Sequence, residues 1–291
     1  MLLDGKQRAQ TILAEIAAEA TELLRDCGDL FPMHPSLETE NLNVALDQAA
    51  EWLRRARRVA VLTGAGVSAE SGLATFRGAG GLWEGHRIED VATPSAFQRN
   101  PAIVWRFYNA RRAALRTAQP NPGHRALAAL EEYFAGEPSD GELFTLITQN
   151  VDGLHQAAGS RRVLELHGSL RRIRCTVCAY KADRGNEELP DLPHCAECGE
   201  LLRPDVVWFE EMLPIETWEA AAKATAACQC FLVVGTSAVV YPAAGLIDAA
   251  SEVGAAVIEV NPEATFASRR GGLGLRGPSG VILPQLVQRL S

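Results

Sequence analysis

The sequence lacks a long uninterrupted hydrophobic run: no apolar segment reaches the roughly 18 to 20 residues that a helix needs to span a bilayer. The N-terminus lacks a basic region ahead of an apolar block, since acidic residues occur at Asp4, Glu15 and Glu19. Positive charge is not in excess, because the formal net charge is −8, which argues against nonspecific nucleic-acid binding. We therefore expect a cytoplasmic protein without a membrane partner or a specific nucleic-acid partner.

What is present suits a globular protein. A chain of 291 residues with 47% hydrophobic content can bury a substantial core, and its length allows one large domain with a smaller one. The negative charge is compatible with a cationic, lysine-bearing protein partner, although ordinary solubility accounts for it equally well.

The seven cysteines are an odd number, and four of them form two CxxC pairs separated by sixteen residues. This spacing is typical of a zinc site, and thiolate ligands imply a reducing compartment. The ligands would be Cys175, Cys178, Cys195 and Cys198. A redox-active CxxC is the competing interpretation, but both pairs lie in short polar turns, CTVC and CAEC. Four thiolates complete a tetrahedral shell, so we expect one structural zinc ion.

The segment after residue 58 has the pattern of a dinucleotide site. Val59 to Leu62 reads as a strand buried on both faces, and the small residues Gly64, Ala65, Gly66 and Ser68 follow it. The backbone there can approach a pyrophosphate closely. The general G-x-G-x-x-G fingerprint is not matched, because the third position after Gly66 is Ala69.

Later apolar runs also end at polar or glycine-rich turns, with helical stretches between them. They are LFTLIT at 143–148, VLEL at 163–166, CFLVVG at 230–235 and AVIEV at 256–260. The alternation predicts an α/β fold with a doubly wound, Rossmann-like parallel sheet. Helices are also expected over 12–24 and 42–58. Ligands of such sheets bind at the carboxyl ends of the strands.

The segment GAGVSAESGLATFRG at 64–78 resembles the nucleotide-binding loop of the sirtuins, which are NAD-dependent protein-lysine deacylases. Four further segments agree with that family in the same order: TQNVDGLH at 148–155, LHG at 166–168, the paired CxxC motifs, and GTS at 235–237. The resemblance covers about residues 59–284 and leaves out roughly the first fifty.

The predicted organisation has three parts. Residues 1–50 form an N-terminal helical extension whose role the sequence does not reveal. A Rossmann-like NAD-binding domain comprises 51–81, 120–170 and 202–291, and a small helical and zinc-binding domain comprises 82–119 and 171–201.

The resemblance implies that the amide oxygen of an acylated lysine attacks NAD and displaces nicotinamide from the ribose. A base must then activate a ribose hydroxyl, and His167 is the candidate, because a histidine can be neutral near pH 7. A lone histidine is more often a core or surface residue. His167, however, follows an apolar strand and precedes Gly168, which leaves room for a ligand.

Other polar residues are candidates for contacts with NAD. Gln149, Asn150 and Asp152 can hydrogen-bond a carboxamide and ribose hydroxyls, and Asp152 can also cap a helix near Gly153. In the family this motif lines the nicotinamide pocket. The remaining candidates are Phe76 as a shield of the reactive centre, Arg77 as a phosphate or loop contact, Gly235, Thr236 and Ser237 as donors at a strand end, and Asn261 at the adenosine ribose.

The acyl group is indicated by a helical segment, VWRFYNARR at 104–112. Tyr108 and Arg111 are three residues apart, so they share a helix face and can bind a carboxylate together. The pair resembles that of class III sirtuins, which remove succinyl, malonyl and glutaryl groups, and Ala92 matches the small residue that enlarges their acyl pocket. An arginine-rich helix can also be a solvated face.

The segment VVWFEE at 206–211 resembles the strand whose backbone pairs with the acyl-lysine peptide. Its candidate substrate-binding residues are Val207, Trp208 and Phe209. Glu210 stands where the family usually has glycine, so a turn with a positive backbone angle would be strained there and would alter the peptide channel.

The leading hypothesis is an enzyme that consumes NAD, removes succinyl or malonyl groups and also acetyl groups, and yields nicotinamide and O-acyl-ADP-ribose. Acylated lysine-bearing proteins are the expected partners. The alternatives are an NAD hydrolase or ADP-ribosyltransferase on the same fold, and a module that senses NAD without turnover. His167, Asn150 and Asp152 favour the enzyme, because a sensor could lose any of them.

Overall fold

The computed structural model describes residues 42–74, 82–83, 86–135, 143–269 and 271–290. The helix expected over 12–24 and the candidates Phe76 and Arg77 lie outside the described residues. Within the described ranges, every helix is too short or too polar to cross a bilayer.

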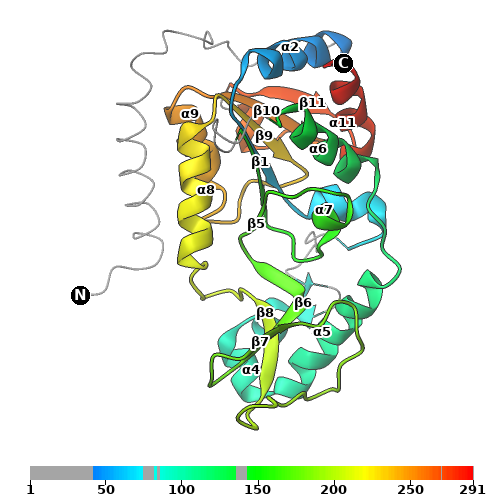
Figure 1. Ribbon diagram of the computed structural model, residues 1–291, viewed down its shortest axis with the longest axis vertical. Helices are drawn as coiled ribbons and strands as arrows, with labels where there is room; N and C mark the ends of the chain where they lie inside the picture. Colours follow the sequence, from blue (N-terminus) through cyan, green and yellow to red (C-terminus); the bar gives the residue numbers. More distant parts are fainter. Residues whose placement is uncertain (1–41, 75–81, 84–85, 136–142, 270, 291) are drawn as a thin grey trace, which may run out of the picture.

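Six parallel strands form the larger sheet in the order β11-β10-β9-β1-β4-β5 (Figure 1). The strands are β1 (Val59–Thr63), β4 (Phe144–Thr148), β5 (Val163–Glu165), β9 (Cys230–Val234), β10 (Ala256–Asn261) and β11 (Leu273–Arg276). Every residue of β1, β4, β9 and β10 is buried, which explains why these runs are apolar almost throughout.

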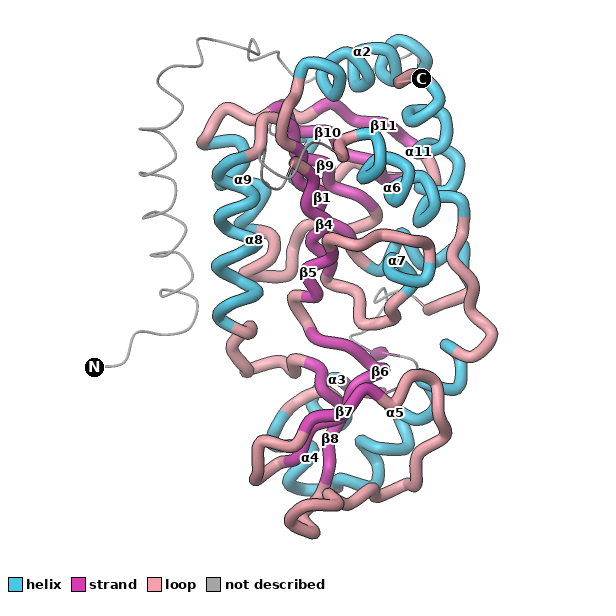
Figure 2. The backbone as a smooth tube through the Cα atoms, viewed as in Figure 1, coloured by secondary structure: helices cyan, strands magenta, loops and turns pink. Residues whose placement is uncertain are grey.

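Successive residues of β1 pack into two different hydrophobic clusters. Val59 and Val61 contact one helix layer, whereas Ala60 and Leu62 contact the layer on the opposite face. The first layer contains α2 (Leu42–Arg55), α6 (Pro122–Tyr133) and α11 (Ser279–Gln288); the second contains α8 (Ile215–Ala227) and α9 (Gly245–Glu252). Figure 2 shows the sheet between the two layers, so the predicted doubly wound fold is confirmed.

The helix expected over 42–58 ends earlier, at Arg55. The backbone N–H groups of Arg57 and Arg58 donate to the side-chain oxygen of Gln229 at 2.6 and 3.1 Å, and not to helical carbonyls. A residue 171 positions away therefore directs the chain into β1, which local sequence could not indicate. The remaining short helices of this part are η1 (Ala65–Ser71), α7 (Leu154–Ala157) and α10 (Phe266–Arg269).

A smaller antiparallel sheet has the order β7-β6-β8 and packs against three helices (Figure 1). Its elements are β6 (Gly168–Cys175), β7 (Lys181–Asp183), β8 (Leu202–Val206), α3 (Ile88–Val91), α4 (Pro94–Arg99) and α5 (Pro101–Leu115), with a hairpin of β2 (Leu82–Trp83) and β3 (His86–Arg87). Trp105 of α5 and Cys175 of β6 belong to one hydrophobic cluster. The helical excursion and the cysteine segment therefore fold together around a shared core.

The loops after β1 and β9 touch through their backbones. The Gly66 N–H donates to the Gly235 carbonyl at 2.7 Å, and a Cβ on Gly66 would lie 2.6 Å from that oxygen. Gly235 has φ of +58°, and a Cβ there would lie 2.3 Å from the Val67 nitrogen. The small residues after β1 are thus required by contact between two loops as well as by access for a ligand.

Replacing Gly66 by alanine should separate these loops and weaken binding of the NAD that the resemblance implies at least tenfold, because a contact of 2.6 Å forces the backbone to move. NAD affinity by calorimetry and thermal unfolding would measure the effect. Gly254→Ala is the matched control: Gly254 has φ of +76° with open space around it, so only a backbone cost of about 1 kcal/mol is expected. Equal NAD affinity in both variants would contradict the loop contact's role.

Candidate functional site

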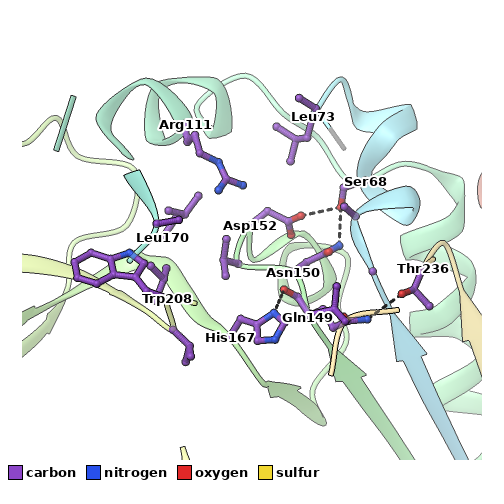
Figure 3. Close-up of a pocket in the computed structure, with 18 of the residues that line it drawn as sticks. Ser68, Leu73, Arg111, Gln149, Asn150, Asp152, His167, Leu170, Trp208 and Thr236 are labelled. Atoms are coloured by element: carbon purple, nitrogen blue, oxygen red, sulfur yellow. Dashed lines mark hydrogen bonds between the residues drawn. The ribbon is translucent and has the colours of Figure 1, made fainter. Parts of the chain in front are cut away.

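A cavity of about 490 Å³ lies at the carboxyl ends of β1, β4 and β9 and extends to α5 and the end of β8 (Figure 3). Seventeen of the sequence candidates line it: Gly64, Ala65, Gly66, Ser68, Ala92, Tyr108, Arg111, Gln149, Asn150, Asp152, His167, Val207, Trp208, Phe209, Gly235, Thr236 and Ser237. Seven segments that are separated in the sequence therefore converge on one space.

Ser68 is the centre of a hydrogen-bonded group on the β1 side of the cavity (Figure 3). Its hydroxyl donates to Asp152 Oδ2 at 2.7 Å and accepts from Asn150 Nδ2 at 3.1 Å. The Ser68 oxygen also lies 3.3 Å from His124 Nε2. The Asn121 N–H donates to His124 Nδ1, so the proton of this imidazole is on Nε2, which donates to Ser68.

A second buried imidazole packs edge to face on the first. The ring centroids of His124 and His155 are 4.9 Å apart. Thr63 Oγ1 donates to Thr148 Oγ1 at 2.7 Å, so His155 Nε2, at 2.9 Å, is the donor to Thr63. Burial lowers the pKa of His124 to about 4 and that of His155 to about 3, and both rings are neutral near pH 7.

His167 lies between β5 and β6 with one ring nitrogen fixed. Its Nδ1 donates to the Gln149 carbonyl at 3.0 Å, which leaves the lone pair on Nε2. Burial lowers the pKa of His167, while the hydrogen bond to Gln149 opposes that shift. The next residue, Gly168, has φ of +75°, and a Cβ there would lie 2.1 Å from the Asp205 carbonyl. The turn that orients the imidazole therefore requires glycine.

Gln149 lines the cavity, whereas Asn261 is buried behind its wall. Gln149 Nε2 donates to Thr236 Oγ1 at 3.0 Å, which joins the ends of β4 and β9 at the cavity wall. Asn261 is not among the lining residues; it is buried behind Thr236, and its amide donates to the carbonyls of Thr236 and Glu263 at 3.4 and 3.1 Å. Its position supports the loop after β9.

Asp152 caps a helix, as the sequence suggested, and it also accepts a hydrogen bond from Ser68. Oδ1 accepts from the Leu154 N–H at 2.9 Å at the start of α7, and Oδ2 accepts from Ser68. Burial raises the pKa of Asp152, while these hydrogen bonds and the positive charge of Arg111 oppose the shift. Figure 3 shows Arg111 reaching from α5 toward this carboxylate.

The α5 end of the cavity combines apolar walls with a phenol and a guanidinium. The Tyr108 oxygen accepts from Trp208 Nε1 at 2.9 Å, so the phenolic proton stays available for donation. Burial raises the Tyr108 pKa to about 12, against the opposing effect of Arg111, and the phenol remains protonated. Ala92, which is buried, closes the same end.

The segment after β8 is held to its surroundings by its own N–H groups. Val207 donates to the His167 carbonyl at 2.9 Å, and Phe209 donates to the Ala92 carbonyl at 3.0 Å. Trp208 donates to the Glu211 carboxylate at 2.8 Å. Since the Glu211 N–H donates to the Trp208 carbonyl at 3.1 Å, these bonds leave the Glu210 N–H as the backbone donor for any extended peptide that pairs with this turn.

The four cysteines of the paired CxxC motifs form one cluster, with all sulfur atoms within 4.8 Å of one another. The closest pairs are Cys175 with Cys198 at 3.5 Å and Cys178 with Cys195 at 3.6 Å. Tetrahedral zinc bonded at about 2.3 Å separates thiolates by about 3.8 Å, so the cluster fits one structural zinc ion with no open coordination position.

Fold and cavity together define an α/β protein of the nucleotide-binding class with a four-cysteine module. A sequence profile of the Sir2 family matches residues 64–242. NAD-dependent protein deacylase 2 of Pyrobaculum aerophilum is 50% identical over 243 residues, covering 83% of this chain and 94% of the relative. The NAD-dependent protein deacylase of Thermococcus kodakarensis is 46% identical over 252 residues, covering 84% and 95%.

Solved structures agree with this assignment. A Sir2 homologue in complex with NAD has a TM-score of 0.77 at 43% identity and covers 89% of this chain and 96% of its own. Sir2Af2 bound to a myristoylated histone peptide has a TM-score of 0.68 at 36% identity and covers 85% and 97%. The chain belongs to the Sir2 family, the sirtuins.

Several residues of the site were not identified from sequence. His124 and His155 lie behind the wall, and Leu73, Leu170 and Tyr241 line the cavity. The run NPGH at 121–124 carried a signal, since Asn121 caps α6 and forms a capping box with His124. The contact between the two imidazoles is a tertiary feature without a local signal.

The two buried imidazoles should make the fold sensitive to acid. Their folded pKa values lie below the ordinary value of 6.5, so the unfolded chain binds more protons between pH 6.5 and pH 4, and stability falls as pH falls through this window. Each histidine contributes a slope of about 1.4 kcal/mol per pH unit. Urea unfolding at several pH values should show a shallower slope for His124→Asn than for the wild type, and equal slopes would contradict this account.

Proposed function

We propose that the chain is an NAD-dependent protein-lysine deacylase that removes succinyl and malonyl groups, and also acetyl groups, from lysine. The products would be nicotinamide and O-acyl-ADP-ribose. One observation carries the proposal: a neutral histidine, a polar hydrogen-bonded group and a tyrosine–arginine pair line the same cavity. The curated relatives named above are NAD-dependent protein deacylases.

In this proposal NAD lies across the carboxyl ends of β1 and β9. Gly64, Ala65 and Gly66 would face the pyrophosphate, because no side chain there larger than a methyl group blocks the backbone. Thr236 and Ser237 line the same wall and offer hydroxyl groups. The NAD complex of a homologue with the same fold supports this assignment.

The nicotinamide end would lie near Asn150, Asp152 and Ser68. Ser68 accepts two hydrogen bonds and donates one, so its rotamer is fixed and the carboxylate and amide beside it are held in place. A preorganised set of polar groups can hold the ribose and carboxamide in the orientation that lets nicotinamide depart.

His167 would accept a proton from a ribose hydroxyl. Its Nδ1 proton is used by the Gln149 carbonyl, so Nε2 is the basic atom, and its lowered pKa keeps it unprotonated near pH 7. The amide oxygen of the acylated lysine would be the nucleophile that the cavity holds in line with the ribose carbon.

The acyl group would extend toward α5. Arg111 supplies a positive charge and Tyr108 an O–H donor, which together suit a terminal carboxylate. Leu170 and Ala92 provide apolar contact for the methylene groups between that carboxylate and the lysine amide. This combination supports succinyl and malonyl groups over a plain acetyl group.

Incubation with succinyl-lysine and acetyl-lysine peptides, with and without NAD, tests the proposal against its alternatives. NAD-dependent deacylation with stoichiometric nicotinamide release is expected. Nicotinamide release without peptide would indicate an NAD hydrolase, and transfer of ADP-ribose to protein would indicate an ADP-ribosyltransferase. Binding of NAD without turnover would indicate a sensor.

Replacing His167 by alanine should lower turnover at least a hundredfold, because the reaction loses its base. NAD affinity by calorimetry and zinc content by elemental analysis should stay near wild type, which excludes unfolding as the cause. His86→Ala is the control, since that histidine is exposed and lies outside the cavity. Near-wild-type turnover of the His167 variant would remove the catalytic assignment.

Replacing Arg111 by methionine should lower the ratio of desuccinylation to deacetylation about thirtyfold, because a hydrogen bond to a charged group contributes about 2 kcal/mol. The ratio of kcat/KM values on matched peptides measures this change. Arg106→Met is the matched control, since Arg106 is an exposed residue of the same helix outside the cavity. An unchanged ratio for the Arg111 variant would show that this residue does not select the acyl group.

A further inference from the structure

Glu210 has a backbone conformation that disfavours its side chain. Its φ is +72°, and it is the third residue of a turn closed by the Glu211 N–H, which donates to the Trp208 carbonyl at 3.1 Å. Glycine is the residue that such a turn prefers at this position. A non-glycine residue here costs about 1 kcal/mol or more, so its presence at a cavity mouth indicates a function for the side chain.

The turn holds Glu210 in one place. The Glu211 carboxylate accepts two hydrogen bonds from Arg203, at 2.6 and 2.8 Å, in addition to the one from Trp208. The Arg203 guanidinium also stacks over the Trp208 ring. Neighbouring Phe209 is tied to the Ala92 carbonyl. Glu211 also lies 3.5 Å from Arg174, so both guanidinium groups beside this turn pair with Glu211 and not with Glu210.

The Glu210 carboxylate is a free negative charge at the mouth of the cavity. The residue is exposed and lines the cavity, and in the described part of the chain its side chain has no ion pair or hydrogen bond. Val207, Trp208 and Phe209 each donate their backbone N–H within the described part of the chain, whereas the Glu210 N–H has no such partner there. An extended peptide that pairs there would carry its side chains past this carboxylate.

We propose that Glu210 selects substrates with a lysine or arginine next to the acylated lysine. The inference rests on the proposed deacylase function and adds a preference for the flanking sequence. The cleft would then have a cationic end at Arg111 for an acyl carboxylate and an anionic mouth at Glu210 for a basic flanking residue. The same carboxylate would repel a peptide with an acidic residue next to the acylated lysine.

The test uses succinyl-lysine peptides that differ only in having arginine, glutamine or glutamate at the residues flanking the modified lysine. The wild-type full chain should show a kcat/KM about five- to tenfold higher for arginine than for glutamate flanks, the size expected when an exposed attractive pair is exchanged for a repulsive one. The preference should shrink with rising ionic strength.

Three variants separate charge from backbone strain. Glu210→Gln keeps the Cβ and should bring the ratio of kcat/KM values for arginine and glutamate flanks near one. Glu210→Gly should have the same effect with a relaxed backbone. Glu210→Lys should reverse the preference. Glu219→Gln removes an exposed charge on α8 outside the cavity and should keep the wild-type ratio. Each ratio is measured within one variant, so differences in folded fraction cancel.

A wild-type ratio near one, or a ratio that survives Glu210→Gln, would overturn the assignment of Glu210 while leaving the deacylase proposal intact. Absence of NAD-dependent turnover on every peptide would overturn both. A preference that disappears in Glu210→Gly and persists in Glu210→Gln would assign the effect to backbone geometry and refute the role of the charge.

Discussion

The close backbone contact between the loops after β1 and β9 is the constraint on which the site depends. Gly66 and Gly235 meet at a distance that excludes any side chain on either. This contact brings the ends of two central strands together, and Gln149 adds a side-chain link from β4 to Thr236. The part of the cavity wall at the ends of β1 and β9 is therefore formed by closely packed backbone, which suits the orientation of a large, charged ligand.

Two neutral imidazoles behind this wall form hydrogen bonds to buried hydroxyl groups. His124 donates to Ser68 and His155 donates to Thr63, so each ring satisfies a hydroxyl without introducing a buried positive charge. The cost of burying an ionised ring is what lowers both pKa values. Burial raises the pKa of Asp152, whereas its hydrogen bonds and the positive charge of Arg111 lower it.

The smaller sheet contributes the other half of the cleft. Its core joins α5 to the strands that carry the cysteine cluster, so a zinc ion that orders those strands also supports the helix bearing Tyr108 and Arg111. The turn after β8 is fixed by Glu211 and Arg203. The chemical character of the cleft thus changes along its length, from a guanidinium at α5 to an uncompensated carboxylate at Glu210.

Local sequence determined the buried strands, the paired cysteines and the small residues after β1, because hydrophobic periodicity, ligand spacing and small residues after a strand are short-range patterns. Most of the other lining residues were predicted from the resemblance of ordered motifs to the sirtuins. Only the tertiary structure decided the rest. Gln229 ends α2 from a distance, Asn261 lies one layer behind the cavity, and two histidines from different elements meet in the interior. The sequence predicted strain at Glu210 only for a turn with a positive φ, and the tertiary structure shows that its φ is positive. These features depend on contacts between residues far apart in the chain, which no local pattern specifies.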